Sequence, residues 1–289
     1  MKAGEMTIND SVSVSDSAPE AQATAAARPR PTRGLPLTGA LLLTAQRLAG
    51  YVAVIALVVL LWQLAILVYQ LPSYLLPSPA ETAQAMRAHS GEIGQAAWLT
   101  VQSTLIGMAV ATLVALLLAL LFMASRALDA ALMPLIIVVR TVPMIAIAPV
   151  LVLIFGRGRW NGVGMVALLS FFQIMLAARK GFEAPSRHML ELMHCCGAGF
   201  WQTLFKLRLP CAMTHLFTGL RIASASAILC AMFAEWLSGA PGLGSLILDA
   251  NARQHFALMW AAVAAGTTVS YLFFTLTLAL ERVVQDWSR

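Results

Sequence analysis

The chain has 289 residues, of which 60% are hydrophobic and 11% are charged, and it carries a formal net charge of +6 at pH 7. Soluble domains have about 45–50% apolar and about 25% charged residues, so this chain has too few polar residues to cover a water-soluble globule. The composition therefore excludes a soluble enzyme, a soluble nucleic-acid-binding protein and a disordered scaffold, and it indicates a membrane protein.

Residues 1–36 differ in composition from the rest of the chain. They are rich in Ser, Ala, Pro and Arg. Such a segment cannot bury enough apolar surface to offset the entropy that is lost on ordering. We therefore expect residues 1–36 to be a disordered cytoplasmic tail and residues 37–289 to form a transmembrane domain.

Long apolar runs follow this tail. A helix needs about 20 apolar residues to cross the roughly 30 Å of hydrocarbon in a bilayer. Every backbone group there must be bonded within its own segment, so the runs predict helices rather than strands. Six runs qualify: residues 48–69, 104–123, 130–155, 161–178, 215–235 and 256–280. The expected fold class is an all-α polytopic membrane protein with six transmembrane helices.

Two of the connections between these runs are too long to be simple turns. Residues 70–95 contain Ser78 followed by Pro79. Serine is a favoured N-cap and proline a favoured first helical residue, so a short interfacial helix is expected to begin there. The other long connection, residues 179–214, is more polar and carries the most specific sequence pattern.

The basic residues indicate how the chain is oriented. They are scattered in short segments between apolar runs, which favours membrane topology over a nucleic-acid partner. Cytoplasmic loops retain Lys and Arg. Placing both termini in the cytoplasm puts most basic residues inside and leaves four arginines in external loops: Arg87, Arg157, Arg159 and Arg253. Residues 179–214 are then cytoplasmic, and Arg140 remains within the bilayer.

The chain lacks a nucleotide-binding loop. Its only lysines are Lys2, Lys180 and Lys206, and none is preceded by Gly and followed by Ser or Thr. A phosphate-binding G-x-x-x-x-G-K-[ST] loop is therefore impossible in this chain. If ATP drives the protein, a partner subunit must hold the ATP and Mg²⁺, and we expect no cofactor in this chain.

A metal site is not expected. His188, His194, Cys195 and Cys196 lie close in sequence. Adjacent cysteines point to different sides of a helix, however, and no C-x-x-C spacing occurs.

A motif lies in the connection at residues 179–214. Glu191 is followed by Gly197 six residues later, and then by Leu207, Leu209 and Pro210. This spacing resembles the E-A-A-x-x-x-G-x9-I-x-L-P motif of the permease subunits of bacterial ABC importers. The two alanines of that motif are replaced by leucine and methionine, and its isoleucine is replaced by Leu207.

Residue chemistry suits such a segment. Gly197 allows a turn between two short helices, because glycine reaches positive φ without penalty, and Pro210 lies where a new helix would begin. The helix between them has apolar residues at i, i+1, i+4 and i+5: Phe200, Trp201, Leu204 and Phe205. An exposed apolar face predicts a protein partner, and the alternative is an amphipathic helix that lies on the lipid surface.

In the family that this motif resembles, the segment is a coupling helix that docks into a groove on the ATPase subunit. The resemblance assigns this role to eight residues: Glu191, Gly197, Phe200, Trp201, Leu204, Leu207, Leu209 and Pro210.

The resemblance extends over most of the chain beyond the tail. It includes Leu76-Pro77-Ser78-Pro79, Arg140-Thr141-Val142-Pro143-Met144-Ile145-Ala146-Ile147-Ala148-Pro149, and Ala234-Glu235-Trp236 with Gly242-Leu243-Gly244 and Ala250-Asn251-Ala252-Arg253. These segments are similar to the branch that imports nitrate, sulfonates, taurine and thiamine-precursor pyrimidines. The last group looks most like the pyrimidine-precursor members, although Phe171-Phe172-Gln173-Ile174 departs from their F-F-P-I.

Three polar residues in the predicted spans are candidates for the pathway or its gate. An arginine at a helix centre costs about 2.5–3.5 kcal/mol on insertion scales, so Arg140 must either contact substrate or satisfy carbonyls freed by nearby prolines, and we favour the second role. Glu235 either gates the external mouth or pairs with an arginine. Gln173 either lines the pathway or bonds a neighbouring helix.

The resemblance implies a type I ABC importer permease fold in the bacterial inner (plasma) membrane. It also implies two ATPase subunits, a second permease copy in a homodimer, an external solute-binding protein and contact with membrane lipid. A hydroxymethylpyrimidine-type thiamine precursor is the expected substrate, with sulfonate, taurine or nitrate as alternatives. The rival function is an ATP-independent secondary transporter or channel. A membrane enzyme is a third possibility, and no nucleophile–base pair supports it.

Overall fold

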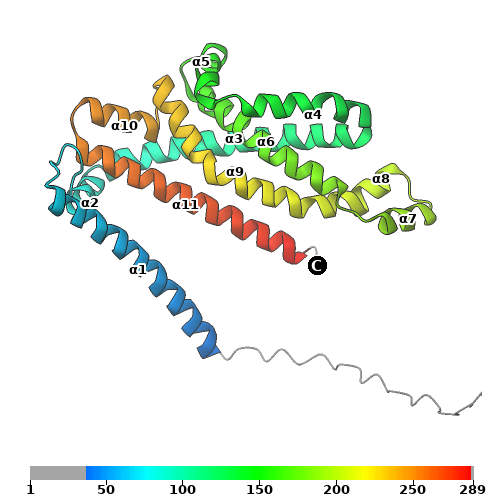
Figure 1. Cartoon of the computed structure of the whole chain (residues 1–289), viewed down its shortest axis with the longest axis horizontal. Coiled ribbons are helices and arrows are strands. Elements are labelled where there is room, and N and C mark those ends of the chain that lie inside the picture. The colour runs from blue at the N-terminus through cyan, green and yellow to red at the C-terminus, as the bar shows by residue number, and fades with distance from the viewer. Residues whose placement is uncertain (1–36, 288–289) are drawn as a thin grey trace, which may run out of the picture. The chain divides into compact units, whose positions relative to one another are not determined.

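The computed structural model describes residues 37–287, and the predicted tail at 1–36 lies outside them (Figure 1). Within the described residues every regular element is helical and none is a strand, which confirms the all-α class. The helices are α1 (Leu37–Tyr69), α2 (Pro79–Ala88), α3 (Ser90–Ala124), α4 (Arg126–Thr141), α5 (Met144–Phe155), α6 (Arg159–Glu183), α7 (Arg187–Cys195), α8 (Phe200–Thr203), a π-helical turn η1 (Leu204–Arg208), α9 (Leu209–Ser238), α10 (Leu243–Ala252) and α11 (Phe256–Trp287).

The described chain divides into two units, with the boundary between Ile55 and Ala56. The second unit contains four helices that are long and apolar enough to cross a membrane: Ser90–Ala124, Arg159–Glu183, Phe200–Ser238 and Phe256–Gln285. The pair α4 and α5 makes a fifth candidate span only if the two helices are counted together. In α1, the described apolar stretch is the shorter Ala53–Tyr69. The structure therefore supports several spans without establishing the expected number of six.

The apolar run at residues 130–155, which was expected to form one span, is divided between two helices. The chain bends by 101° between α4 and α5. Val142 is extended, with φ −68° and ψ 127°, as the residue before a proline prefers to be. Pro143 then begins the new helix direction at the N-cap of α5. The two helices together have the geometry of a broken span or a re-entrant loop.

Small residues allow the core helices to approach closely. Helix α6 packs against α3 on one side and α9 on the other, and α11 packs against α9. One face of α3 carries small buried residues at four-residue spacing: Gly107, Ala111, Ala115 and Ala119. A Cβ at Gly107 would lie 2.8 Å from the carbonyl oxygen of Val163 on α6. Close packing of small residues is a main source of helix association in lipid.

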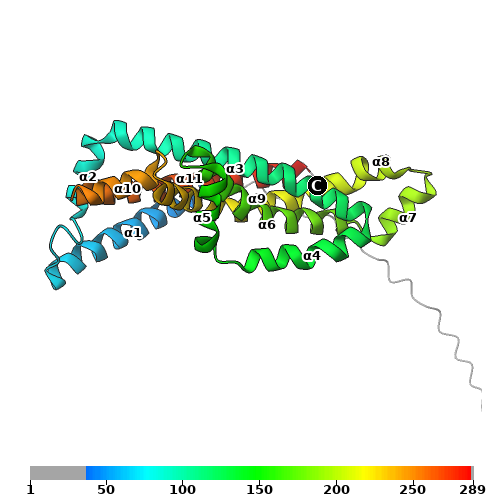
Figure 2. The same cartoon turned by 90° about the horizontal axis from the view of Figure 1, so that it is seen from above.

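Two groups of short helices lie at opposite ends of this bundle. Helices α2 and α10 are at one end, and α7 and α8 are at the other (Figures 1 and 2). The helix expected after Ser78 is confirmed as α2: the Ser78 hydroxyl accepts from the Glu81 N–H, and the Glu81 carboxylate accepts from the Ser78 N–H. This reciprocal capping fixes where α2 begins.

Candidate functional site

The turn between α7 and α8 is built around Gly197. Its φ is +68°, in the left-handed region that favours glycine. The Gly197 N–H donates to the carbonyl of His194, and the Ala198 N–H donates to the carbonyl of Met193. These two bonds form a Schellman motif, which ends α7 and redirects the chain into α8. The structure therefore has the glycine turn that the sequence predicts.

Three aromatic side chains project from α8 and η1, and we refer to them as the aromatic patch: Phe200, Trp201 and Phe205. The Trp201 side chain is the most exposed of the three at 66%. Its ring contacts Phe200 edge-on at 5.5 Å between centroids and stacks on Phe205 at 6.0 Å. Leu204 differs from the predicted face, because it is buried in the core of the bundle. It thus attaches the patch to the bundle.

The π-helical turn joins the aromatic patch to α9 without a break. The Leu209 N–H donates to the carbonyl of Leu204, five residues earlier. Pro210 is in the first turn of α9, where its missing N–H is tolerated. The helical path consequently runs from Phe200 to Ser238. The aromatic patch and a candidate span therefore belong to one helical segment.

The remaining residues of the predicted coupling motif lie near this segment. Glu191 is exposed on α7, with its carboxylate 3.7 Å from the imidazole of His188. Leu207, Leu209 and Pro210 are half-buried along η1 and the start of α9. Of these residues, Glu191 therefore lies on the exposed α7, and the other three lie where η1 continues into α9.

At the opposite end of the bundle, Glu235 is only 2% exposed. Its Oε2 accepts from the N–H of Gly244 at 2.9 Å and from the hydroxyl of Thr100 at 3.0 Å. The Thr100 hydroxyl in turn accepts from the N–H of Leu243 at 3.0 Å. Gly244 and Leu243 begin α10, so the carboxylate is bound at the positive end of a helix dipole. We call Glu235, Thr100 and the start of α10 the Glu235 clamp.

Two glycines make room for this clamp. A Cβ at Gly242 would collide with the carboxyl group of Glu235, and one at Gly244 would collide with the carbonyl of Met232. In the sequence, Gly242-Leu243-Gly244 was identifiable only as part of a resemblance, and no sequence pattern pointed to Thr100. The expected pairing of Glu235 with an arginine is not found among the described residues.

Two buried amides lie in the same bundle with unsatisfied oxygens. Asn161 is fully buried, and its amide N–H donates to the carbonyl of Ala234, while its Oδ1 has no partner among the described residues. Gln173, also on α6, has a buried Oε1 without a partner in the same part of the chain. In the described part of the chain, neither amide forms a hydrogen bond with the Glu235 carboxylate. Gln173 instead lies beside Gly219 of α9, 16 positions before Glu235.

Arg140 lies exposed on α4, one residue before the helix ends at Thr141. Within residues 37–287 its guanidinium has no hydrogen bond or ion pair. The expected bonds to carbonyls freed by prolines are thus not observed in a single copy of the chain.

A further buried polar contact joins α9 to α11. Arg221 lies 2.9 Å from Glu281 in an ion pair, and the Thr218 hydroxyl donates to the same carboxylate at 2.6 Å. Glu281 is buried, so these partners offset the desolvation of its charge. This pair was not predicted, because Arg221 and Glu281 are 60 positions apart in the sequence.

The part of the chain that the structure describes contains no group of three or more His, Cys, Asp or Glu residues that could hold a metal ion. His188, His194, Cys195 and Cys196 are all exposed on or just after α7.

Comparison with known proteins gives consistent results. Residues 111–289 match the family described as binding-protein-dependent transport system inner membrane component. The chain is 31% identical to the "Probable ABC transporter permease protein" of Haemophilus influenzae, over 84% of this chain and 98% of that protein. It is 29% identical to the formylaminopyrimidine transport permease protein ThiX of Halalkalibacterium halodurans, over 75% of this chain and 87% of that one.

A third relative is the riboflavin transport system permease protein RibX of Chloroflexus aurantiacus, which is 30% identical over 82% of this chain and 90% of its own length. Among solved structures, a chain of the MetNI methionine ABC transporter in an inward-facing conformation is similar. The TM-score is 0.57 at 17% identity, with 68% of this chain and 98% of that chain covered. At this identity the likeness concerns the fold alone.

Proposed function

The chain belongs to the family of binding-protein-dependent transport system inner membrane components, and from this membership we propose that it is the permease subunit of an ATP-driven importer. In this proposal the spans form the translocation pathway for a small polar solute that an external binding protein delivers. Two copies of the chain make the complete pathway as a homodimer. Two cytoplasmic ATPase subunits hold the ATP and Mg²⁺.

The aromatic patch is the observation that carries this proposal. Exposed Trp and Phe side chains are typical anchors of protein interfaces, and these follow a glycine turn at the root of a candidate span. We propose that the patch docks on an ATPase subunit. Closure of the ATPases on ATP then draws the two patches together. Because α8, η1 and α9 are helically continuous, this movement rocks α9 and opens the pathway.

The proposed orientation follows from the basic residues. The end of the bundle that carries α7 and α8 is placed in the cytoplasm, together with both termini. The end that carries α2, α10 and the Glu235 clamp then faces outward, towards the binding protein. There Glu235 has a structural role in the external gate, because its carboxylate accepts hydrogen bonds from the start of α10 and from Thr100 of α3 and so holds them together.

We propose a hydroxymethylpyrimidine-type thiamine precursor as the substrate. Support comes from the Glu235-Trp236 and Gly242-Leu243-Gly244 segments and from the relative named for formylaminopyrimidine transport. An anionic substrate such as a sulfonate, taurine or nitrate is the second candidate. It is favoured by the free guanidinium of Arg140 and by relatives named for sulfonate and taurine transport.

Trp201→Ala tests the proposed docking role. Loss of a central aromatic anchor typically costs about 2 kcal/mol or more, so the affinity of the permease for its ATPase should fall about thirtyfold. Transport in proteoliposomes that contain permease, ATPase and binding protein should fall in parallel. The chain alone should show neither ATPase activity nor uptake driven by an ion gradient.

Trp160→Ala is the matched control. Trp160 is similarly exposed at 58%, but it lies at the start of α6, away from the patch. This variant should bind the ATPase normally. Uptake by the purified chain alone on an ion gradient would contradict the proposal and favour a secondary transporter.

Arg140→Gln tests whether this arginine serves folding or the pathway. An arginine in contact with lipid is expensive, so its exposure in one copy indicates that a watery pathway or the second copy covers it. We expect membrane yield and thermal stability to stay within about 0.5 kcal/mol of the unsubstituted protein, while uptake falls at least about tenfold. The measurements are membrane abundance, apparent Tm and uptake kinetics.

Arg157→Gln is the control for Arg140→Gln, because Arg157 is an exposed arginine just beyond α5. It should change neither yield nor uptake. A low yield of the Arg140 variant with normal affinity in the surviving transporters would instead show the structural role that the sequence favoured.

A further inference from the structure

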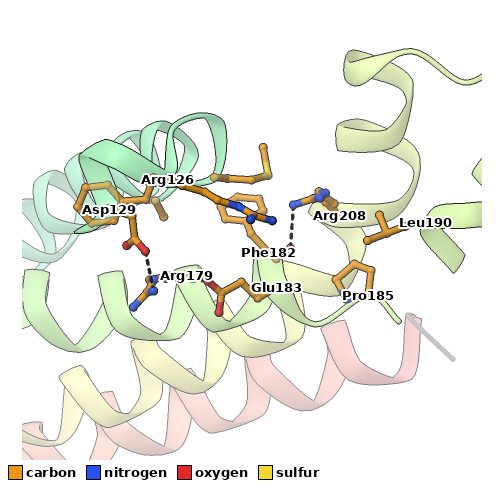
Figure 3. A pocket seen from close by; sticks show the side chains of 11 residues that line it. Arg126, Asp129, Arg179, Phe182, Glu183, Pro185, Leu190 and Arg208 are labelled. Carbon is orange, nitrogen blue, oxygen red and sulfur yellow. Dashed lines mark hydrogen bonds and ion pairs between the residues drawn. The ribbon is translucent and has the colours of Figure 1, made fainter. Parts of the chain in front are cut away.

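A cavity of about 420 Å³ lies where α3 ends, α4 begins and α6 meets η1. Its apolar wall is formed by side chains near the end of α3 and by Phe182 of α6. Its polar wall contains three arginines and two carboxylates: Arg126, Arg179, Arg208, Asp129 and Glu183 (Figure 3). We call this cavity the arginine pocket.

The two carboxylates of the pocket are both engaged by the same arginine. Arg179 lies 2.8 Å from Asp129 and 3.5 Å from Glu183. Among the described residues, no acidic side chain pairs with Arg126 or Arg208. The Arg208 guanidinium donates only to the carbonyl of Phe182, at 3.4 Å. The five charged side chains of the lining thus sum to +1. Arg126 and Arg208 are the two positive charges among them that have no acidic partner.

The two unpaired guanidinium groups face the same space. Figure 3 shows Arg126, from the start of α4, and Arg208, from η1, pointing towards one another above Phe182. Like charges in this arrangement repel, and an anion between them relieves that repulsion. Arginine binds phosphate groups through paired N–H donors, which makes a phosphate anion the best chemical fit.

The place of the pocket in the fold favours a lipid as the source of that phosphate. The apolar sequence of α3 ends at Ala124, two residues before Arg126. In the orientation that we proposed above, on which this step depends, the pocket lies at the cytoplasmic surface of the bilayer. Basic pockets between transmembrane helices on that side bind anionic lipid headgroups, and the apolar wall suits the first carbons of the lipid chains.

We propose that the arginine pocket binds the phosphate group of an anionic membrane lipid through Arg126 and Arg208. A lipid bound there bridges the α3–α4 turn and η1, the segment that precedes α9. It therefore strengthens the attachment of the aromatic patch to the bundle.

The test uses the full-length permease purified in a neutral detergent. It is titrated with dioleoylphosphatidylglycerol, with dioleoylphosphatidylcholine and with inorganic phosphate, and binding is measured by native mass spectrometry and by the shift in apparent Tm. Phosphatidylglycerol should bind and stabilise the protein, and phosphatidylcholine should do so much less. Stabilisation by inorganic phosphate that is equally strong, and is lost in the arginine variants, would support the phosphate site and identify its source as the free anion.

Arg126→Gln and Arg208→Gln should each weaken phosphatidylglycerol binding about tenfold, and the double variant should weaken it about a hundredfold. Arg282→Gln, at an exposed position near the end of α11, should bind as the unsubstituted chain does. Arg126→Lys should restore part of the binding, because it keeps the charge, and Arg126 is exposed enough that folding should not suffer.

The proposal would be overturned if the double variant bound phosphatidylglycerol as strongly as the unsubstituted chain does. It would also be overturned if the unsubstituted chain bound phosphatidylglycerol and phosphatidylcholine equally well. A double variant that binds lipid normally but loses the ATPase would overturn it as well, because the pocket would then receive a side chain of the partner. The lipid measurement needs no ATPase or substrate, so its failure leaves the importer proposal untouched. Conversely, an inactive importer that binds phosphatidylglycerol through these arginines would leave the lipid site standing.

Discussion

Gly244→Ala is expected to prevent the end of the bundle that carries α10 from folding correctly. The added Cβ would collide with the carbonyl oxygen of Met232 and lie 2.8 Å from the carbonyl carbon of the same residue. Those atoms belong to the backbone of α9 and cannot turn away as a side chain can. Overpacking usually costs about 1–3 kcal/mol, and we expect at least the upper value here. The amount of monodisperse protein extracted from the membrane, and its apparent Tm, should both fall sharply.

The control is Gly91→Ala. Gly91 is at the start of α3, and a Cβ there would have no neighbour within 4 Å. Alanine also has a higher helix propensity than glycine, so this variant should match or exceed the stability of the original chain. If Gly244→Ala folded as well as Gly91→Ala, the close approach of α10 to α9 would be wrong.

Thr100→Val provides a second perturbation of the same clamp. The substitution keeps the shape of the side chain but removes the donor to Glu235 and the acceptor for the Leu243 N–H. A buried group left without its partner costs about 1–3 kcal/mol. A loss of stability for Gly244→Ala and Thr100→Val, with none for Thr112→Val, would identify the clamp as the cause. The Thr112 hydroxyl bonds only a carbonyl of its own helix.

Local sequence rules predicted those parts of the fold that depend on local interactions. Ser78 and Pro79 begin α2 as expected, since capping depends on residues within one turn. Four of the apolar runs became candidate spans. The stripe at Gly107 and the alanines of α3 was also visible in the sequence, as small residues at four-residue spacing, and that signal was overlooked.

The break between α4 and α5 shows where such rules stop. The run at 130–155 contains three prolines, Pro134, Pro143 and Pro149. Two of them lie inside helices, and only Pro143 coincides with the 101° bend. Every proline removes the same hydrogen bond, so the position of the bend depends on tertiary packing that the sequence of the run alone does not contain.

The candidate site also has a part that the sequence could predict and a part that it could not. The turn at Gly197 could be predicted, because a glycine between two short helical segments indicates positive φ. The Glu235 clamp could not, because its partner Thr100 is 135 positions away in the sequence. The burial of Leu204 amid exposed aromatic neighbours was also unpredictable from spacing, since the π-helical turn changes which side each residue faces.

Gly197→Val should produce the largest functional loss without a loss of protein. Gly197 has φ +68°, and a β-branched residue there is strongly disfavoured. Left-handed backbone costs an ordinary L-residue about 1–2 kcal/mol, so the turn should change shape and α8 should point in a different direction from α7. Membrane abundance should stay normal, because the position is exposed. Coupled transport and ATPase stimulation should fall at least about tenfold.

A graded series separates this backbone effect from a lost contact. A Cβ at Gly197 would have no neighbour within 4 Å, and the same holds at Gly199, which has an ordinary φ of −72°. Gly199→Ala should therefore transport normally. At Gly197, activity should decrease from Asn through Ala to Val, because asparagine tolerates the left-handed region best of the three. Equal activity of all three Gly197 variants, at equal expression, would show that the direction of α8 does not depend on this turn. An equal loss in all three would point instead to a partner that approaches Gly197 too closely for any side chain. Only the conformational explanation predicts that the activities of the three variants follow their preference for positive φ rather than their size.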